Sequence, residues 1–490
     1  MELKKILSGI DNLKAKGSLD IDITSITSDS REVSEGSLFI AIKGFETDGH
    51  KYIAKAIENG AKAVMVEDIE ELKKIKNIDD ITIIISLNTR YSMAIAACNF
   101  YSNPSKKFKL IGITGTKGKT TTSFMIKKIL EKQGKKVGLI GTVAIYIGDK
   151  KLEDSDRTTP ESTKLQEIFS LMVKEKVDVV IIEVSSQSLK LDRVAGCDFD
   201  LGVFTNLSED HISEKEHPDM EDYFNSKLKL FNMCKKAYIN VDDVHGLKVL
   251  KSDTTSEKHT YGIDNSAELI AKDITVGNTA VDYKVKFNGK NERIKICIPG
   301  RFSVYNSLAA ISVCLELGAT SENIIESLLE VRIPGRSELV DNEKNLAIMI
   351  DYAHSPESLQ NILTAAKAYA KGKVICVFGC GGDRDPGKRK IMGEISGNLA
   401  DYTIITSDNP RTEDPELIVK EIEEGMKKTS GKYVCIVDRK KAIRHAINNM
   451  AKRDLVILAG KGHEPYQEIN HEKFPFDERE IVKEIINQMK

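Results

Sequence analysis

The sequence predicts an α/β protein of three domains, in which mainly parallel sheets are covered by helices. Apolar runs of four to six residues alternate with helical stretches, the pattern of parallel strands that are buried on both faces. A chain of 490 residues is too long for one hydrophobic core. A glycine-rich stretch, residues 112–122, follows one apolar run and opens a helical pattern, which is typical of α/β domains that bind phosphate.

The expected elements follow in order along the chain. Before residue 107 the sequence mixes short strands with two helices, and residues 101–107 indicate a linker. The middle of the chain then alternates strand and helix, and a second α/β series begins after residues 333–336. The predicted strands are 37–42, 63–66, 81–85, 110–113, 137–140, 178–183, 201–205, 347–350, 374–378, 402–406, 433–437 and 455–459, and the predicted helices before the second series are 54–60, 91–101, 121–133 and 161–176.

Composition favours small-molecule partners. The chain has 72 basic and 74 acidic residues, interspersed, and a net charge of −2, so it has no long-range field for nucleic acid or an anionic membrane. The amino terminus lacks the apolar core of a signal peptide, and no run of about 18 apolar residues occurs. We therefore expect a cytoplasmic protein. The eight cysteines are scattered, and the closest pair, Cys376 and Cys380, is expected to be buried thiols rather than metal ligands.

The glycine-rich stretch predicts a site for the phosphates of a nucleoside triphosphate. Gly115 and Gly118 let backbone N–H groups close around phosphate oxygens, Lys119 can reach the outer phosphates, and the Thr120 hydroxyl can bind Mg²⁺. The spacing departs from the usual G-x-x-x-x-G-K-[ST] motif, because the position five before Gly118 is Ile113. A glycine turn without a ligand is the alternative.

Polar residues follow the ends of other predicted strands, where ligands bind in parallel sheets. Glu183 ends an apolar strand and is expected either to be paired or metal-bound, or to cap the next helix. Residues 206–211 end another strand and offer His211 as a neighbouring ligand. Lys227 lies on a predicted amphipathic helix, where the sequence alone favours a surface lysine without a specific function.

In the second α/β series, polar turns end three neighbouring strands. Arg384 follows a glycine turn, Arg411 follows Asp408-Asn409-Pro410, and Glu464 follows Gly460-Lys461-Gly462-His463. Arginines can bind carboxylates in bidentate fashion and a glutamate can bind an ammonium group. This edge is therefore suited to a zwitterionic amino acid.

Together these motifs resemble the Mur ligase family over essentially the whole chain, and most closely its MurE branch, the UDP-N-acetylmuramoyl-tripeptide synthetases. The matching motifs are 114–120, 158–160, 183–186, Asn206 with Asp210 and His211, Lys227, 334–336, 351–354, 381–384, 408–411 and 460–464. The resemblance implies a UDP-binding α/β domain over residues 1–106, a central P-loop ATPase domain over 107–336 and a Rossmann-like amino-acid domain over 337–490.

The resemblance also implies a reaction. The terminal carboxylate of UDP-N-acetylmuramoyl-L-alanyl-D-glutamate attacks the γ-phosphate of ATP, and an amine then displaces phosphate from the acyl phosphate. Lys119 and two Mg²⁺ ions offset the charge on the phosphoryl group. The presence of Arg411 implies that the amino acid added is meso-diaminopimelate rather than lysine, because a second carboxylate needs a cation at its end of the pocket. We expect a monomeric enzyme of peptidoglycan synthesis.

The family assigns roles to individual residues. The resemblance implies that the catalytic residues are Lys119, Glu183, His211 and Lys227. It also implies that Lys227 is carbamylated by CO₂ and binds metal together with Thr120, Glu183 and His211. Residues matching the ATP contacts are Gly115, Thr116, Lys117, Gly118, Lys119, Thr120, Thr121, Asn306, Arg336, Asp351 and His354. Those matching the UDP-muramyl-peptide contacts are Ser30, Phe45, Thr47, Thr158, Thr159, Ser185 and Arg193, and those matching the amino-acid contacts are Arg384, Asp408, Asn409, Arg411, Gly460 and Glu464.

The chain departs from the family at residues 209–217 and at Gln187 and Leu191, where the family commonly has other residues. These departures leave open a related ligase that adds lysine or another amino acid, or extends a different nucleotide-linked peptide. A P-loop kinase or GTPase would leave Lys227 and the arginines of the third domain without a purpose. A non-catalytic relative would be expected to lack Lys119, Glu183 or Lys227, and all three are present.

Overall fold

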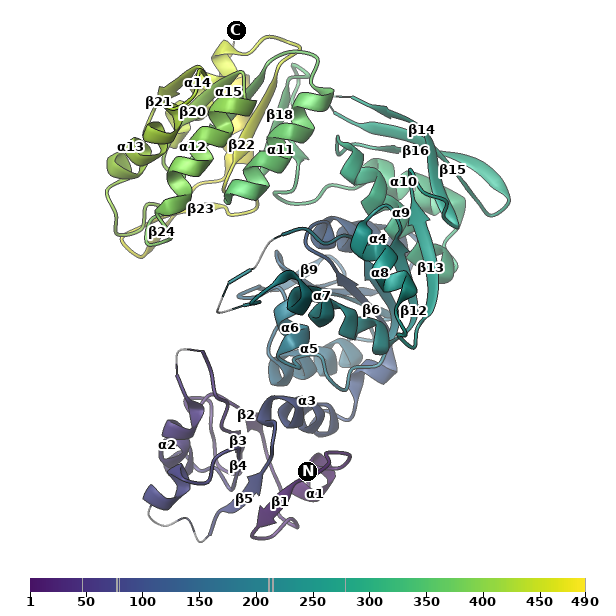
Figure 1. Cartoon of the computed structure of the whole chain (residues 1–490), viewed down its shortest axis with the longest axis vertical. Helices are drawn as coiled ribbons and strands as arrows, with labels where there is room; N and C mark the ends of the chain where they lie inside the picture. The colour runs from purple at the N-terminus through teal and green to yellow at the C-terminus, as the bar shows by residue number, and fades with distance from the viewer. Residues whose placement is uncertain are drawn as a thin grey trace. The chain divides into compact units, whose positions relative to one another are not determined.

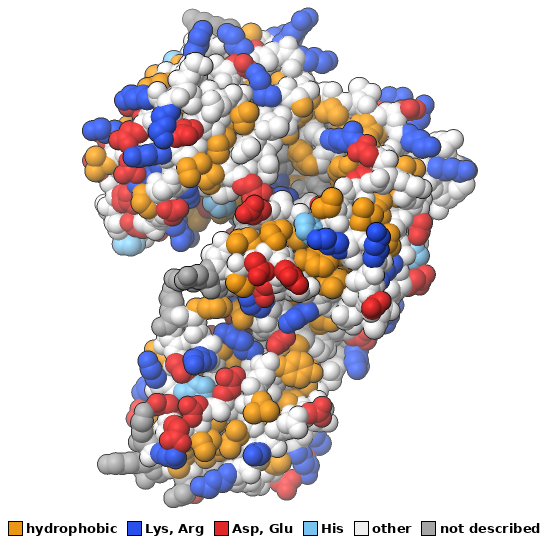
Figure 2. All heavy atoms as spheres, viewed as in Figure 1, with side chains coloured by type: hydrophobic (Ala, Val, Ile, Leu, Met, Phe, Trp, Pro, Cys, Tyr) orange, Lys and Arg blue, Asp and Glu red, His pale blue; other side chains and the backbone are white. Residues whose placement is uncertain are grey.

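The computed structural model describes residues 1–45, 47–75, 78, 80–209, 212–213, 216–277 and 279–489 (Figure 1). The chain divides into two compact units, residues 1–268 with 312–317 and residues 269–311 with 318–490. Each unit is described by itself, and the three domain boundaries remain a prediction. Within the described ranges, no helix has the length and apolarity that a membrane span requires. Lys and Arg side chains are interspersed with Asp and Glu over the visible face of each unit (Figure 2), as the small net charge predicts.

The first unit begins with a five-stranded sheet in the order β1-β5-β4-β3-β2, parallel except for β1. One face packs against α1 and α3, and the other packs against α2. Asn88 is the N-cap of α3, and its side chain accepts a hydrogen bond from the Tyr91 N–H. The elements are α1 (Leu3–Ile6), β1 (Lys14–Lys16), β2 (Ile26–Thr27), β3 (Leu38–Ile40), η1 (Gly49–Tyr52), α2 (Ile53–Glu58), β4 (Ala63–Val66), η2 (Glu71–Lys74), β5 (Thr82–Ile85), α3 (Thr89–Phe100) and η3 (Pro104–Lys107).

The larger sheet of the first unit has the order β13-β12-β11-β6-β10-β7-β8-β9, parallel from β13 to β7. The strands β8 and β9 add an antiparallel edge. Helix α4 packs against β6, β7 and β10. The elements are β6 (Lys109–Thr114), α4 (Lys119–Lys132), β7 (Val137–Ile140), β8 (Ala144–Ile147), β9 (Lys150–Asp154), α5 (Ser162–Lys174), β10 (Val179–Glu183), α6 (Ser186–Lys190), β11 (Phe199–Phe204), α7 (Met220–Leu228), η4 (Lys229–Asn232), β12 (Cys234–Asn240), α8 (Val244–Lys251) and β13 (Glu257–Gly262).

The second unit contains an antiparallel meander and a six-stranded sheet. The meander pairs β14 with β15 and β15 with β16, and the sheet has the order β17-β18-β22-β19-β20-β21, parallel except for β17. The helices α11, α12 and α13 cover one face and α14 and α15 the other (Figure 1). The elements of the meander and its helices are β14 (Leu269–Val276), β15 (Val281–Phe287), β16 (Lys290–Ile296), α9 (Arg301–Glu316) and α10 (Ser321–Glu330). Those of the sheet and its helices are β17 (Glu338–Leu339), β18 (Ala347–Asp351), α11 (Pro356–Tyr369), β19 (Val374–Phe378), α12 (Gly387–Leu399), β20 (Tyr402–Ile405), α13 (Pro415–Met426), β21 (Tyr433–Cys435), α14 (Arg439–Asn449), β22 (Leu455–Ala459) and α15 (Glu478–Gln488). The strands β23 (Tyr466–Ile469) and β24 (Glu472–Pro475) form a separate antiparallel hairpin.

The two parallel sheets confirm the predicted placement of the strand ends. Lys119 follows β6, which lies between β10, ending at Glu183, and β11, which precedes Asn206. In the second unit β22, β19 and β20 are neighbours, so the turns that follow them lie along one edge. Cys376 and Cys380 are buried, as expected.

Candidate functional site

The loop between β6 and α4 is held in a fixed conformation by the residues that follow β11. Asn206 clamps it from both sides: its Oδ1 accepts from the Lys117 N–H at 2.9 Å, and its Nδ2 donates to the Lys117 carbonyl at 3.1 Å. Gly115 and Gly118 adopt φ of +149° and +86°, which side chains disfavour. Gly118 is the N-cap of α4 and brings no capping side chain, so the first-turn N–H groups of α4 face the loop.

We predict that Gly115→Ala weakens nucleotide binding and destabilises the first unit. A Cβ at this position would lie 1.9 Å from Thr205 Oγ1 and 3.0 Å from the Asn206 carbonyl, so the loop must shift. The expected loss of stability is about 1 to 3 kcal/mol. Thermal melting and nucleotide titration measure the two effects. Gly134→Ala is the matched control for a left-handed glycine, because a Cβ there meets no atom within 4 Å. Unchanged nucleotide affinity in Gly115→Ala would contradict the prediction.

Two lysines converge on the same carbonyl of this loop. Lys119 Nζ donates to the Gly115 carbonyl at 2.7 Å and to the Thr116 carbonyl at 3.0 Å. Lys227 Nζ, on α7, donates to the Gly115 carbonyl at 3.1 Å and lies 4.5 Å from the centre of the Tyr223 ring. Lys227 is only 1% exposed, although the sequence alone favoured a surface position. The fold therefore brings both lysines to the loop between β6 and α4.

Glu183 lies in a cluster of oxygen atoms beside this loop. The carboxylate is fully buried, and its Oε2 accepts from Thr120 Oγ1 at 3.0 Å and from Thr142 Oγ1 at 2.9 Å. Gly141 permits this packing, since a Cβ there would lie 2.2 Å from Glu183 Oε1. A carboxylate beside two hydroxyl groups is a donor set that suits Mg²⁺. Thr120 and Glu183 are therefore placed to share one ion.

A cavity of about 730 Å³ is lined by Lys119 and Lys227 and by the segment that follows β3 in the same unit. It brings together predicted residues from both parts of the first unit, namely Phe45, Thr47, Lys119, Thr158, Thr159, Ser185, Arg193 and Lys227. Gln187 and Leu191, two of the departures from the family pattern, also line it. Ser30 is not among the lining residues, and its carbonyl accepts from Asn59 Nδ2 at 2.8 Å. His211 lies outside the described residues.

The cavity also contains cations that sequence reasoning missed. Arg90 and Arg157 line it together with Arg193 and Glu161. Arg157 Nη1 and Arg193 Nη2 lie 2.6 and 2.8 Å from Glu161 Oε1, and burial lowers the pKa of Arg193 although Glu161 opposes this effect. Arg157 directly precedes the Thr158-Thr159-Pro160 motif, so its place in the sequence could have identified it as a cavity residue. Nothing in the local sequence distinguishes Arg90.

Arg193, Thr159 and Ser185 form one hydrogen-bonded support. The Thr159 hydroxyl donates to the Glu183 carbonyl at 2.8 Å and accepts from the Ser185 N–H at 3.1 Å. Arg193 Nη1 donates to the Thr159 carbonyl at 3.2 Å. The cavity wall is thereby tied directly to the strand that carries Glu183.

In the second unit, Arg336 and His354 gather around Tyr352 beside Asp351. The Arg336 guanidinium lies 5.2 Å from the centre of the Tyr352 ring, and the His354 ring centre lies 4.6 Å from it. Burial raises the pKa of Asp351, whose Oδ2 accepts from the Ser337 N–H at 2.7 Å. Asn306, on α9, is buried.

The turns that follow β20 and β22 form the second candidate site. Asn409 Nδ2 donates to Glu464 Oε2 at 2.8 Å, and Lys461 Nζ donates to Asn409 Oδ1 at 2.8 Å. These two contacts fix which way the amide of Asn409 faces. Gly460 has φ of +116°, and a Cβ there would lie 2.5 Å from Asp408 Oδ2. The turns are therefore closely fitted to one another, as the shared sheet edge predicted.

One glycine-containing loop, which follows β19, contacts both arginines. Arg411 Nη1 donates to the Gly382 carbonyl at 2.7 Å, and a Cβ at Gly381 would lie 2.9 Å from that nitrogen and 3.9 Å from Arg384 Cγ. Arg384 itself is exposed. Both predicted arginines therefore flank the same loop.

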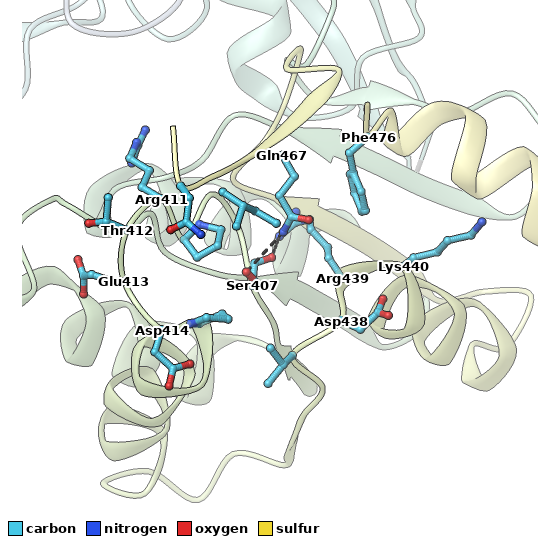
Figure 3. Close-up of a pocket in the computed structure, with 15 residues that line it drawn as sticks. Ser407, Arg411, Thr412, Glu413, Asp414, Asp438, Arg439, Lys440, Gln467 and Phe476 are labelled. Atoms are coloured by element: carbon cyan, nitrogen blue, oxygen red, sulfur yellow. Dashed lines mark hydrogen bonds between the residues drawn. The ribbon is translucent and has the colours of Figure 1, made fainter. Parts of the chain in front are cut away.

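A second cavity, of about 890 Å³, lies beside Arg411 (Figure 3). Its charged side chains are largely bound within the protein: Arg439 pairs with Glu478 at 2.8 Å, and Lys440 with Glu484 at 2.7 Å. Asp414 and Asp438 cap α13 and α14. Arg411 also lines this cavity, and its Nε and Nη1 are bound to Glu468 and to the Gly382 carbonyl.

Comparisons with known proteins find similar proteins over nearly the whole chain. Three family models match the chain: the Mur ligase family catalytic domain over residues 22–105, the Mur ligase middle domain over 113–314 and the Mur ligase glutamate ligase domain over 335–462. A relative from Caldanaerobacter subterraneus subsp. tengcongensis, named UDP-N-acetylmuramoyl-L-alanyl-D-glutamate–2,6-diaminopimelate ligase, is 49% identical over 99% of both chains. A relative of the same name from Clostridium botulinum is 48% identical over 96% of both.

Solved structures match in the same way. One titled as a UDP-N-acetylmuramoyl-L-alanyl-D-glutamate–2,6-diaminopimelate ligase has a TM-score of 0.73 at 28% identity and covers 99% of both chains. The MurF ligase from Thermotoga maritima, solved with ADP, has a TM-score of 0.57 at 19% identity, with 95% of this chain and 97% of that chain covered, and supports the fold. The predicted three-domain α/β class and the resemblance to the family are confirmed.

Proposed function

The chain belongs to the Mur ligase family, and from this membership we infer that it joins meso-2,6-diaminopimelate to UDP-N-acetylmuramoyl-L-alanyl-D-glutamate. Relatives that match over nearly the full length carry this activity in their names. The reaction forms an amide bond, converts ATP to ADP and phosphate, and supplies peptidoglycan synthesis. Mur ligases use ATP and Mg²⁺, so both are assigned to this chain.

The observation that carries the proposal is that Lys119 and Lys227 line one cavity with Thr158 and Ser185. Lys227 is bound to the Gly115 carbonyl, and Glu183 is bound to Thr120, the residue after Lys119. A carboxylate is a poor electrophile until one of its oxygens becomes a good leaving group, and transfer of the γ-phosphoryl group achieves this. The reaction therefore requires a substrate carboxylate and the ATP phosphates side by side, and this cavity offers surfaces for both.

We assign the phosphate contacts to residues 115–121 at the amino terminus of α4. The N–H groups of the loop and first helical turn would donate hydrogen bonds to the phosphate oxygens, and Lys119 would leave its two loop carbonyls to face the γ-phosphate. Thr120 and Glu183 would hold one Mg²⁺, which supplies positive charge against the phosphates. His211 is assigned to the second ion on the family resemblance alone.

We propose that Lys227 carries a carbamate. Addition of CO₂ to its amine would replace a buried cation with an anionic group whose oxygens can bind Mg²⁺. The support is positional, because Nζ lies 3.1 Å from the Gly115 carbonyl and faces the cavity that contains Lys119. A lysine that only packed against Tyr223 would have no need to reach the phosphate loop.

We assign the UDP-muramyl-dipeptide to the cavity walls of the first unit. Phe45 and Thr47 would contact the nucleotide end, and Thr158, Thr159, Ser185 and Arg193 would contact the muramyl peptide. Ser30 is assigned to the nucleotide on the family resemblance alone. Arg90 and Arg157 add positive charge for an anionic substrate. In the second unit, Asn306, Arg336, Asp351 and His354 are assigned to ATP.

The amino-acid site is assigned to Arg384, Asp408, Asn409, Arg411, Gly460 and Glu464. In this assignment an ammonium group of diaminopimelate faces Glu464 and Asn409, and the far carboxylate faces the two arginines that flank Gly381.

A substrate screen tests the proposed function. Phosphate release would be measured for UDP-muramyl peptides of different length crossed with diaminopimelate, lysine and ornithine. We expect the dipeptide with diaminopimelate to give the highest rate. Gln187 and Leu191 line the acceptor cavity, so a preference for another nucleotide-linked peptide is the outcome that would identify a related ligase instead.

Arg411→Ala should lose selectivity for diaminopimelate. Leaving the far carboxylate without its cation should cost about 2 to 5 kcal/mol, or roughly 30- to several-thousand-fold in kcat/KM for diaminopimelate. The affinity for ATP should stay near that of the wild type, because Arg411 lies outside the proposed nucleotide contacts. Initial rates with diaminopimelate and lysine at equal concentration measure the change.

Arg411→Lys is the matched variant, since it keeps the charge but loses the planar guanidinium and its fixed donor geometry. It should fall between wild type and Arg411→Ala. A wild-type protein that prefers lysine or ornithine would refute the assignment of the amino acid.

A further inference from the structure

Arg411 has an unusual backbone conformation that a hairpin holds in place. Its φ is +53°, in the left-handed region that non-glycine residues rarely adopt. The Arg411 N–H donates to the Glu468 carbonyl at 3.1 Å, and the Asn470 N–H donates to the Arg411 carbonyl at 2.8 Å. Residue 411 is thus bridged to strand β23 of the β23–β24 hairpin, which offsets the strain.

The hairpin also holds the guanidinium group. Glu468 Oε2 lies 3.0 Å from Arg411 Nε, and the two side chains are only about one-fifth exposed. With Nη1 bound to the Gly382 carbonyl, two of the three nitrogens have fixed partners. Nη2 has no hydrogen-bond partner in the part of the chain that the structure describes.

Strand β23 also forms hydrogen bonds with the loop that precedes Arg411. The Glu468 N–H donates to Asn409 Oδ1 at 3.0 Å, and Gln467 Nε2 donates to the Asp408 carbonyl at 2.6 Å. Gln467 also reaches Ser407 (Figure 3). Strand β23 therefore supports this loop through several hydrogen bonds, and Glu468 contributes the contact with the Arg411 guanidinium.

We propose that Glu468 is a positioning residue for amino-acid selection, which acts by fixing the Arg411 guanidinium so that Nη2 faces the far carboxylate of the substrate. This inference rests on the proposed function. Arginine has many rotamers, and a side chain that is already ordered loses less entropy when the ligand binds. Glu468 does not itself contact the amino acid in this arrangement.

The geometry favours positioning over competition. A carboxylate that competed with the substrate would bind the Nη1 and Nη2 end of the guanidinium, where bidentate pairing is strongest. Glu468 instead occupies Nε, and the Gly382 carbonyl occupies Nη1. The remaining nitrogen is the one that a ligand can use.

The test compares Glu468→Ala and Glu468→Gln with wild type in steady-state assays with diaminopimelate and with lysine. Glu468→Ala should raise KM for diaminopimelate about 10- to 100-fold, with kcat and the KM for ATP near wild type. The KM for lysine should not change, since lysine lacks the far carboxylate. Glu468→Gln keeps an acceptor for Nε–H and should give an intermediate KM. Glu472→Ala, an exposed change on β24 of the same hairpin, should behave as wild type.

A double-mutant cycle separates positioning from a general loss of structure. In the Arg411→Ala background, Glu468→Ala should have no further effect on KM for diaminopimelate. A further rise in that background, or an unchanged or lower KM in Glu468→Ala alone, would overturn the inference. A wild-type protein without preference for diaminopimelate would instead refute the proposed function, so the two failures can be told apart.

Discussion

Lys119→Ala is expected to lower the rate of phosphoryl transfer by about a hundredfold or more, because one group that stabilises transition-state charge is worth ~3 kcal/mol or more. Lys119 is placed for this role by the loop itself, since its Nζ binds the Gly115 and Thr116 carbonyls beside the amino terminus of α4. Single-turnover measurement of phosphate release in the presence of the dipeptide substrate reports this step directly.

Binding of the uridine nucleotide should survive this change. The residues assigned to it, Phe45 and Thr47, belong to the amino-terminal part of the first unit, and Ser30 lies beside Asn59 there. Isothermal titration with the UDP-linked substrate is the measurement. Lys135→Ala removes one exposed cation just beyond α4 and should match wild type in both assays. If uridine-nucleotide binding vanished in Lys119→Ala, the assignment of substrates to separate parts of the chain would be wrong.

The sequence could locate the sites because parallel sheets place chemistry at strand ends. Glu183 and Lys119 are far apart in the chain, yet each follows a buried apolar run, and neighbouring parallel strands bring such ends together. The same rule predicted that the turns carrying Arg411 and Glu464 would meet. The strands, and the sheet edge at which their polar residues lie, could be predicted from local hydrophobic patterns alone.

The antiparallel meander was not predicted from the sequence. Its central strand, β15, alternates buried and exposed residues over Val281–Phe287, which is a readable signal for a strand with one buried face. The neighbouring strand β14 is less regular and contains a register shift between Lys272 and Thr275. Such a bulge breaks the period of two, so this strand gives a weaker pattern.

Side chains that support the sites from distant segments could not be predicted either. His217, in a segment that departs from the family pattern, is fully buried, with Nδ1 2.6 Å from Asp222 Oδ2 and Nε2 2.9 Å from Ser186 Oγ. It therefore links α6 to α7, which carries Lys227. Burial lowers the pKa of His217, against the opposing effect of Asp222. The link depends on how two helices pack, which no local period reveals.

Lys227→Ala should lower ligation by roughly 100- to 1,000-fold, the cost of removing one group that stabilises developing charge. Because the proposed group on Lys227 is a carbamate, the substitution removes anionic oxygens rather than a cation. Lys227 lines the cavity, so its removal leaves space that a short carboxylate can enter. Added acetate should therefore restore part of the activity, because its oxygens can replace those of the carbamate.

The choice of additive distinguishes a carbamate from an ordinary lysine. Methylammonium replaces a missing cation and acetate replaces a missing anion, so a lysine that acts as an amine predicts rescue by the first and a carbamate predicts rescue by the second. Lys119→Ala is the internal control, since it loses a cation near the same Gly115 carbonyl and should not respond to acetate. Full activity of Lys227→Ala without additive, or rescue by methylammonium alone, would show that the charge at this position is not the one proposed.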